Sequence, residues 1–182
     1  MPKVNLQNQA TLTQQFLHDL LHYDPATGIF TWRVSRGAAV AGQEAGFLDA
    51  STGYRKVVID GRRYLANRLA IFYVTGQWPP HLVDHENLSR TDNAFDNLRQ
   101  ASNAQNLWNQ EKSAKVTGRP NASRFKGVSW DAARGRWAAN ISQNGTYIRL
   151  GRFASEEAAA RAYDAAAVQL HGEFARLNFP IA

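Results

Sequence analysis

The sequence predicts an α+β fold built from two small domains. Short stretches of alternating apolar and polar residues are bounded by clusters of Gly, Pro, Asn and Asp, which is typical of short antiparallel strands. Helix signals with their own start and stop residues follow these strands. Residues 115–154 carry eight Lys or Arg and one acidic residue, whereas residues 1–114 carry eleven and ten. Such a basic block indicates a unit with a polyanionic partner.

The N-terminal region is expected to combine helices with a hairpin. The expected elements are a helix over residues 12–22, a strand over 29–34, hairpin strands over 54–59 and 62–65, and a helix over 67–74. Asp60 and Gly61 form a dipeptide that favours a tight hairpin turn. Asn67 is expected to cap the second helix, and Gly76 is expected to end it.

Residues 82–109 are polar but carry the signals of a strand, a loop, a second strand and a helix. The strands are expected over residues 82–85 and 97–101, with a loop rich in Asn, Asp and Ser between them. Ser102 is a good helix N-cap, and Gln105 three residues later completes a capping box.

This strand, loop, strand and helix can bring Asp84, His85 and Asn106 to one point. A carboxylate and an amide oxygen suit a hard cation such as Mg²⁺, which keeps most of its waters in protein sites. A neutral imidazole beside that cation is a suitable base for activating water near neutral pH. The alternative is that Asn and Asp in a loop are turn formers and that a lone His is structural. Asn93 is interpreted as such a turn residue.

The motifs Val-Asp-His, Thr-Asp-Asn, Asp-Asn-Leu-Arg and Gln-Asn-Leu-Trp-Asn, in this order and spacing, resemble the HNH endonucleases of phage and homing type. The resemblance implies a ββα-metal finger nuclease domain with an N-terminal helix and hairpin extension. It implies that His85 is the general base and that Asp84 and Asn106 hold one divalent ion, Mg²⁺ with Mn²⁺ as the alternative. It also implies that Asn97 orients His85 through its backbone carbonyl.

The region before this core resembles the same family in its Tyr-Asp-Pro-Ala-Thr-Gly stretch and in the hairpin that follows. Where the family has His-Arg-Leu, this sequence has Asn67, Arg68 and Leu69, so a His is missing near the site. Two roles remain open for Arg68, namely contact with the scissile phosphate of DNA or exposure to solvent.

The C-terminal region is expected to form three antiparallel strands and one helix. The strands are expected over residues 125–130, 136–142 and 147–153, and the helix begins after Ser155 and ends at Gly172. Phe-Lys-Gly-Val-Ser-Trp, Leu-Gly-Arg-Phe and Leu-Asn-Phe-Pro, among other motifs, resemble the plant apetala-two/ethylene-response-factor domain over residues 124–180. The resemblance implies a sheet that docks in the major groove of double-stranded DNA. The residues expected at DNA are Lys126, Trp130, Arg136, Asn140, Tyr147 and Arg149.

The expected domains are a nuclease domain over residues 1–111, a basic linker over 112–123 and a DNA-binding domain over 124–182. The chain has no Cys, which excludes disulfides and thiolate zinc sites. It has no apolar stretch near the ~18 residues of a membrane span and no signal-peptide pattern at its start. We therefore expect a cytoplasmic protein of a bacterial or phage-infected cell, acting as a monomer or a homodimer.

The predicted function is a metal-dependent DNA endonuclease in which a C-terminal module positions the nuclease core. One active site per chain predicts nicking by a monomer. The alternative, from a different class, is a DNA-binding regulator whose nuclease half is vestigial. An RNA-directed nuclease is a third alternative, which the groove-reading sheet disfavours.

Overall fold

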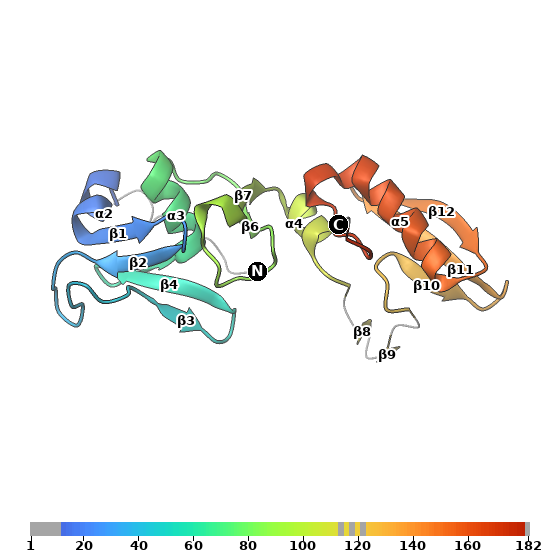
Figure 1. Ribbon diagram of the computed structural model, residues 1–182, viewed down its shortest axis with the longest axis horizontal. Coiled ribbons are helices and arrows are strands. Elements are labelled where there is room, and N and C mark those ends of the chain that lie inside the picture. The colour runs from blue at the N-terminus through green and yellow to red at the C-terminus, as the bar shows by residue number, and fades with distance from the viewer. Residues whose placement is uncertain (1–11, 113–114, 117–118, 121–122, 181–182) are drawn as a thin grey trace. The chain divides into compact units, whose positions relative to one another are not determined.

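The computed structural model describes residues 12–112, 115–116, 119–120 and 123–180 (Figure 1). Contacts divide the chain into two compact units, unit 1 over Met1–Ala101 and unit 2 over Ser102–Ala182. Both units mix helices with small sheets, as an α+β fold requires. The unit boundary precedes the predicted domain end at residue 111, because the helix after Ser102 packs within unit 2. The expected domains over residues 1–111 and 124–182, with a linker over 112–123, stay predictions.

Over residues 12–101, unit 1 has three small antiparallel sheets and two α-helices. Its elements are α2 (Gln14–Leu20), β1 (Leu21–Asp24), β2 (Ile29–Trp32), β3 (Phe47–Asp49), β4 (Tyr54–Ile59), β5 (Arg62–Leu65), α3 (Ala66–Thr75), β6 (Leu82–His85), the 3₁₀ turn η1 (Phe95–Asn97) and β7 (Leu98–Ala101). The sheets are β1-β2, β3-β4-β5 and β6-β7. One core of buried side chains from α2, β1, β2, β4 and α3 joins them.

The hairpin of β4 and β5 has the expected bounds, and both Asp60 and Gly61 adopt the positive φ of its tight turn. The first helix is shorter than expected, because Leu21 leaves it to pair with Trp32 across β1 and β2. Asn67 lies inside α3 and does not cap it. Its side-chain amide donates to Val83 O at 3.1 Å and so ties α3 to β6.

Among its described residues, unit 2 has a three-stranded sheet, a two-stranded sheet, one long helix and a short preceding helix. Its elements are α4 (Asn103–Asn109), β8 (Lys115–Val116), β9 (Arg119–Pro120), β10 (Val128–Asp131), β11 (Arg136–Gln143), β12 (Thr146–Phe153), α5 (Glu156–His171) and the 3₁₀ turn η2 (Gly172–Phe174). The capping box of Ser102 and Gln105 is present on α4, as expected. The predicted linker contains β8 and β9, and its other residues lie partly outside the described ranges.

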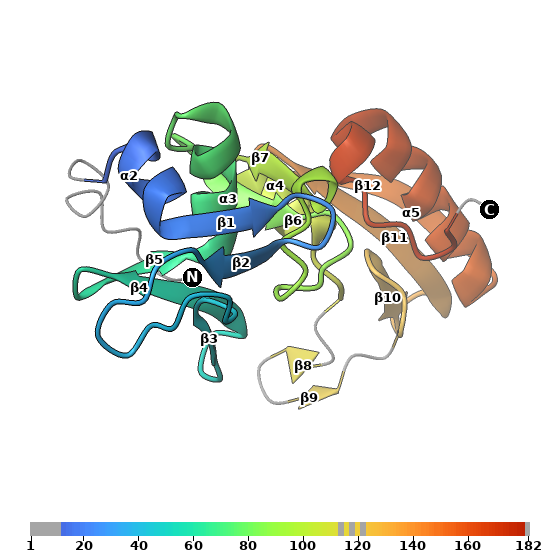
Figure 2. The same ribbon diagram turned by 60° about the vertical axis from the view of Figure 1, so that its left-hand side comes forward.

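The sheet has the order β10-β11-β12, and α5 lies across one of its faces (Figures 1 and 2). Residues paired across antiparallel strands share a face. The face toward α5 therefore carries Val128 and Ala139, which pack on alanines of the helix. Gly127 permits a close approach, since an added Cβ would lie 2.0 Å from the Tyr163 ring.

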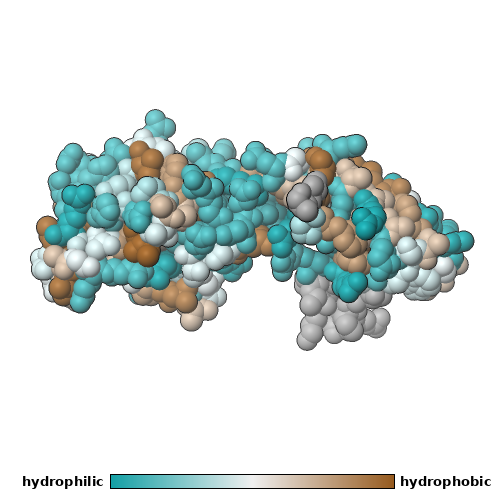
Figure 3. All heavy atoms as spheres, in the orientation of Figure 1, coloured by the Kyte–Doolittle hydropathy of each residue, from teal (hydrophilic) through white to brown (hydrophobic). Residues whose placement is uncertain are grey.

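On the face shown in Figure 3, the surface of unit 1 is mostly hydrophilic and its hydrophobic residues form small separate patches. Among the helices described, none has the length and apolar character needed to cross a membrane.

Candidate functional site

The hairpin of β6 and β7 places the two residues that begin the predicted site. Asp84 and His85 end β6 and are 5% and 3% exposed. Their partners across the hairpin are Arg99 and Leu98. Both side chains therefore sit in a largely desolvated environment, where polar interactions are stronger than in water.

The ring of His85 is oriented by Asn93. The amide nitrogen of Asn93 donates to Thr91 O at 3.2 Å, which turns its Oδ1 toward His85 Nε2 at 3.1 Å. Because Oδ1 only accepts, Nε2 carries the hydrogen of the neutral ring. The lone pair of that tautomer is then on Nδ1, which is the nitrogen able to accept a proton.

Burial lowers the pKa of His85 below its ordinary value, and this effect outweighs the raising effects of the Asn93 hydrogen bond and of Asp84 and Asp92. The imidazole is therefore neutral at pH 7. A neutral imidazole with a fixed tautomer meets the requirement for a general base.

The N-terminal hairpin supports the loop that carries Asn93. The Tyr23 hydroxyl donates to Asn93 O at 2.8 Å, and burial raises the pKa of that hydroxyl, so it stays protonated. The Phe95 N–H donates to Pro25 O at 2.8 Å. Gly28 lies directly against the same loop with φ +73°. The β1-β2 hairpin thus positions Asn93, and through Asn93 it positions His85.

Gly28→Ala is expected to destabilise unit 1 and to disturb this loop. The added Cβ would lie 2.1 Å from Asn93 C and 2.3 Å from Ala94 N, so the backbone must move. We expect a loss of roughly 2–4 kcal/mol in the free energy of unfolding, from overpacking and the left-handed φ. Urea denaturation measures it. Gly61→Ala is the matched control, since nothing lies within 4 Å of its Cβ position and only the backbone penalty applies.

The carboxylate of Asp84 forms an ion pair with Arg99. Nε and Nη2 of Arg99 both lie 3.1 Å from Asp84 Oδ2. The two residues face each other across β6 and β7, and both side chains are largely buried. The pair compensates the negative charge of Asp84 in this desolvated position.

The donor atoms present suit a hard cation held mainly by water. Asp84 supplies a carboxylate, and Asn106 on α4 supplies an amide oxygen. Within the described residues, no three His, Cys, Asp or Glu side chains form a metal-binding group. A cation that relies on one or two protein ligands fits this donor set, as Mg²⁺ does. Asp84 belongs to unit 1 and Asn106 to unit 2, and their convergence stays a prediction.

Asn97 and Arg68 both bind backbone groups of neighbouring loops. The Asn97 carbonyl accepts from Glu86 N–H at 3.0 Å, and its side chain bonds to Asn87 N and Asp92 O, so Asn97 braces the loop. Nε2 of His85 bonds to Asn93 Oδ1, and the orientation of His85 by the Asn97 carbonyl stays a prediction. Arg68 neither faces solvent nor is open to DNA. It is 5% exposed and donates to Pro79 O and His81 O at 2.6 Å each.

Helix α4 is attached firmly to the rest of unit 2. The Lys126 ammonium donates to Trp108 O at 2.5 Å and to Gln110 O at 2.6 Å, at the C-terminal end of α4. Burial, with a smaller effect of Arg176, lowers the pKa of Lys126 to about 8. The Trp108 and His171 rings stack with centroids 4.3 Å apart. Lys126 was expected at DNA, but its ammonium holds α4.

The face of the sheet away from α5 carries the exposed basic residues. Arg136, Arg149 and Tyr147 are exposed on it, and Tyr147 is 70% exposed. Asn140 shares this face with Arg149 but is only 8% exposed. Trp130 differs from the expectation, because it pairs with Trp137 on the α5 side and their rings meet edge to face. The DNA contacts of the exposed residues stay predictions.

Two segments of the chain match known families. Residues 64–107 match the family described as HNH endonuclease, and residues 123–173 match the AP2 domain. The chain carries an HNH endonuclease domain and an AP2 domain. The HNH match runs from the β5 hairpin strand to α4 and includes Asp84, His85 and Asn106. The AP2 match includes the three-stranded sheet and α5.

Curated relatives resemble the chain over part of its length. An ethylene-responsive transcription factor of Nicotiana tabacum is 48% identical over 79 residues, which cover 37% of this chain and 33% of that protein. An AP2/ERF and B3 domain-containing protein of Oryza sativa subsp. japonica is 48% identical over 71 residues, 36% of this chain and 19% of that protein. An AP2-like ethylene-responsive transcription factor of Arabidopsis thaliana is 43% identical over 63 residues, which cover 35% of this chain and 13% of that protein.

Asn93 and Arg99 of the HNH domain are site residues that the sequence alone did not indicate. Only the charge pattern offered a signal for Arg99, since opposite charges at facing positions of a hairpin attract each other.

Asn93→Ala is expected to lower any cleavage rate about 10- to 100-fold at pH 7, because the His85 ring loses the acceptor that fixes its tautomer. Asn93→Asp keeps an acceptor and should retain more activity. Its carboxylate raises the pKa of His85, so the acid limb of the pH–rate profile should move to higher pH. Equal pH profiles for the wild type and Asn93→Asp would contradict the assigned contact.

Proposed function

We propose that this protein is a metal-dependent DNA endonuclease of the HNH type. The observation that carries the proposal is the state of His85, which is buried, neutral at pH 7 and oriented by Asn93, next to the carboxylate of Asp84. The match of residues 64–107 to the HNH endonuclease family supports it.

In this proposal, His85 Nδ1 takes a proton from a water molecule that attacks the scissile phosphorus in line. The chain holds the ring in place through Asn93, whose loop is held by Tyr23 and Gly28. Asp84 and Asn106 would hold a divalent ion, Mg²⁺ in our proposal with Mn²⁺ as the substitute, which supplies electrostatic stabilisation of the phosphate in the transition state. Arg99 keeps the Asp84 carboxylate in position through its ion pair.

The AP2 domain would supply DNA affinity and direct the nuclease to its site. Arg136 and Arg149 project from the sheet face opposite α5 and are exposed. Arg side chains bind phosphates and the edge of guanine, and a sheet can enter the major groove. The partner proposed is therefore double-stranded DNA, and one active site per chain corresponds to nicking.

The chemistry of the product ends tests the proposal. Attack by water with departure of the 3′ oxygen leaves a 5′-phosphate and a 3′-hydroxyl. Nicked plasmid made by the protein should be resealed by DNA ligase without prior treatment. Nicks that ligase seals only after phosphatase and kinase treatment would contradict this bond cleavage. Asp84→Asn serves as the low-activity comparison.

The second candidate is a DNA-binding regulator without nuclease activity. Two observations favour it. The relatives from Nicotiana tabacum and Arabidopsis thaliana are transcription factors, and Arg99 already engages Asp84. This candidate expects DNA binding by the full chain and no cleavage with any divalent metal.

A further inference from the structure

Unit 2 contains a pocket of about 540 Å³ that borders the exposed basic face, and the proposed nuclease chemistry does not use it. We name it the α4–β11 pocket. It is lined by Leu107 and Trp108 of α4, Asn140 of β11, Tyr147 of β12, His171 of α5 and Lys126, among others. Its volume falls in the range of about 300–1,000 Å³ in which proteins hold small ligands.

Two buried polar side chains in this pocket each have one atom without a hydrogen-bond partner. Asn140 is 8% exposed and His171 is 5% exposed. In the part of the chain that the structure describes, Asn140 Oδ1 and His171 Nδ1 are the buried side-chain atoms without a hydrogen-bond partner. Buried polar atoms are normally paired, so these two atoms mark a place where a ligand can supply hydrogen-bond donors.

Both atoms act as acceptors. His171 Nε2 lies 2.9 Å from Ser142 O, and a carbonyl only accepts, so Nε2 carries the hydrogen of the ring. Nδ1 is then a bare acceptor. Burial lowers the pKa of His171, and Lys126 lowers it further against the raising effect of the Ser142 carbonyl, so the ring is neutral at pH 7. The stack of Trp108 on this ring holds it in place.

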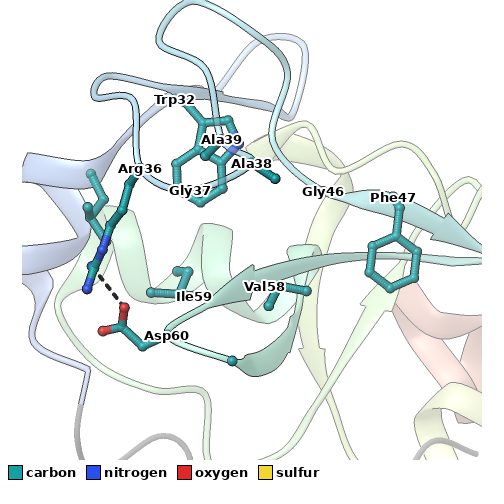
Figure 4. Close-up of a pocket in the computed structure, with 12 residues that line it drawn as sticks. Trp32, Arg36, Gly37, Ala38, Ala39, Gly46, Phe47, Val58, Ile59 and Asp60 are labelled. Carbon is teal, nitrogen blue, oxygen red and sulfur yellow. Dashed lines mark ion pairs between the residues drawn. The ribbon is translucent and has the colours of Figure 1, made fainter.

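A second pocket, in unit 1, lacks this feature. It has a volume of about 440 Å³ and is lined by Trp32, Phe47 and Val58, among others (Figure 4). Its charged residues, Arg36 and Asp60, form an ion pair with each other at 2.8 Å. It offers an apolar wall, whereas the α4–β11 pocket combines aromatic walls with two unpaired acceptors.

We propose that the α4–β11 pocket binds an unstacked nucleobase that carries an exocyclic amino group, such as adenine. An amino group donates hydrogen bonds, and both unpaired atoms in this pocket are acceptors. The Asn140 amide can also donate to a ring nitrogen of the same base, as Asn does when it binds adenine. Tyr147 supplies exposed aromatic surface, on which bases commonly stack.

The position of the pocket connects it to the DNA proposed above, and only the source of the base depends on that proposed function. Asn140 and Tyr147 lie on the sheet face that carries Arg149, so a nucleotide turned out of a bound strand is one source. A free nucleoside or nucleotide is the other source. Thymine and hypoxanthine have no amino group and should bind poorly.

The test uses the full chain without divalent metal, so that it is independent of cleavage. Adenosine and inosine are titrated while the Asn140 side-chain amide and the Trp108 indole are followed by nuclear magnetic resonance. Inosine has a carbonyl and an N1–H where adenosine has the amino group and a bare N1. Short oligo(dA) and oligo(dT) are compared in the same way. Asn140→Leu removes both hydrogen-bonding groups, and Thr146→Ala, an exposed change on the same hairpin outside the pocket lining, is the control.

Adenosine should bind at least about tenfold more tightly than inosine, or oligo(dA) more tightly than oligo(dT), with shifts at Asn140 and Trp108. Tighter binding of adenosine would identify a free nucleoside as the ligand. A preference for oligo(dA) without a preference for adenosine would identify a base within a strand. Asn140→Leu should abolish the preference, and Thr146→Ala should keep it. Equal binding of both members of each pair, no shift at either residue, or an unchanged preference in folded Asn140→Leu would overturn the proposal. Loss of plasmid cleavage would bear on the nuclease alone.

Discussion

His85→Ala is expected to lower the rate of DNA cleavage about 10²- to 10⁴-fold while DNA binding is retained. The expected loss is the usual contribution of a positioned general base. Binding should persist because the exposed basic face lies in unit 2, whereas His85 ends β6 in unit 1. Time courses on plasmid DNA and a binding gel at the same salt concentration measure the two properties separately.

The same assignment has a pH dependence. Burial holds the pKa of His85 below its ordinary value, so the base form persists below the usual range for histidine. The midpoint of the acid limb of the wild-type pH–rate profile should therefore lie below the ordinary histidine pKa of about 6.5.

His81→Ala is the matched control for the substitution at His85. His81 is exposed, four residues earlier, and only its backbone carbonyl has a described contact, with Arg68. Its removal should leave cleavage unchanged. Thermal unfolding of each variant separates a catalytic loss from misfolding, since His85 is buried. Cleavage by folded His85→Ala at the wild-type rate would show that His85 is not the base.

The double substitution Arg136→Ala with Arg149→Ala is expected to weaken DNA binding roughly a hundredfold at moderate salt. Each lost contact is expected to reduce the binding free energy by ~1–3 kcal/mol. Both side chains are exposed on the sheet face opposite α5. If both contact phosphates, the slope of log K against log salt should become shallower by roughly 1.8, because each neutralised phosphate contributes ~0.9. Fluorescence anisotropy over a series of salt concentrations measures both effects.

Arg161→Ala is the control for that double variant. Arg161 is exposed on α5, and its guanidinium lies over the Phe179 ring at 4.7 Å, away from the basic face. Loss of this charge should leave the salt slope nearly unchanged. A hundredfold loss of affinity in Arg161→Ala, with none in the double variant, would place the DNA on the opposite side of the sheet.

Local chemistry explains which parts of the fold could be predicted from the sequence. The turn at Asp60 and Gly61 and the capping box of Ser102 and Gln105 depend on residues within a few positions, and both occur as expected. Tertiary pairing overrode local signals elsewhere. Leu21 fits the helical pattern but is buried in β1. Asn67 is of a residue type that often caps helices, but its side chain donates to Val83 O of β6.

Long-range contacts explain the site residues that the sequence did not indicate. Asn93 has the composition of a turn residue, and its role depends on Tyr23, which is seventy positions away. Arg68 looked exposed because the carbonyls that bind it come from the Pro79–His81 bend. Lys126 belongs to a basic block, but only the packing of α4 shows that its ammonium is enclosed.

The most direct test of the nuclease assignment is incubation of supercoiled plasmid with the wild-type protein in Mg²⁺, Mn²⁺ or chelator, followed on an agarose gel. We expect conversion to open circles with either metal and none with chelator, and His85→Ala should leave the plasmid supercoiled. Linear product would indicate paired cutting. Intact plasmid under all conditions, with the same DNA shifted in a binding gel, would contradict the nuclease and support the regulator.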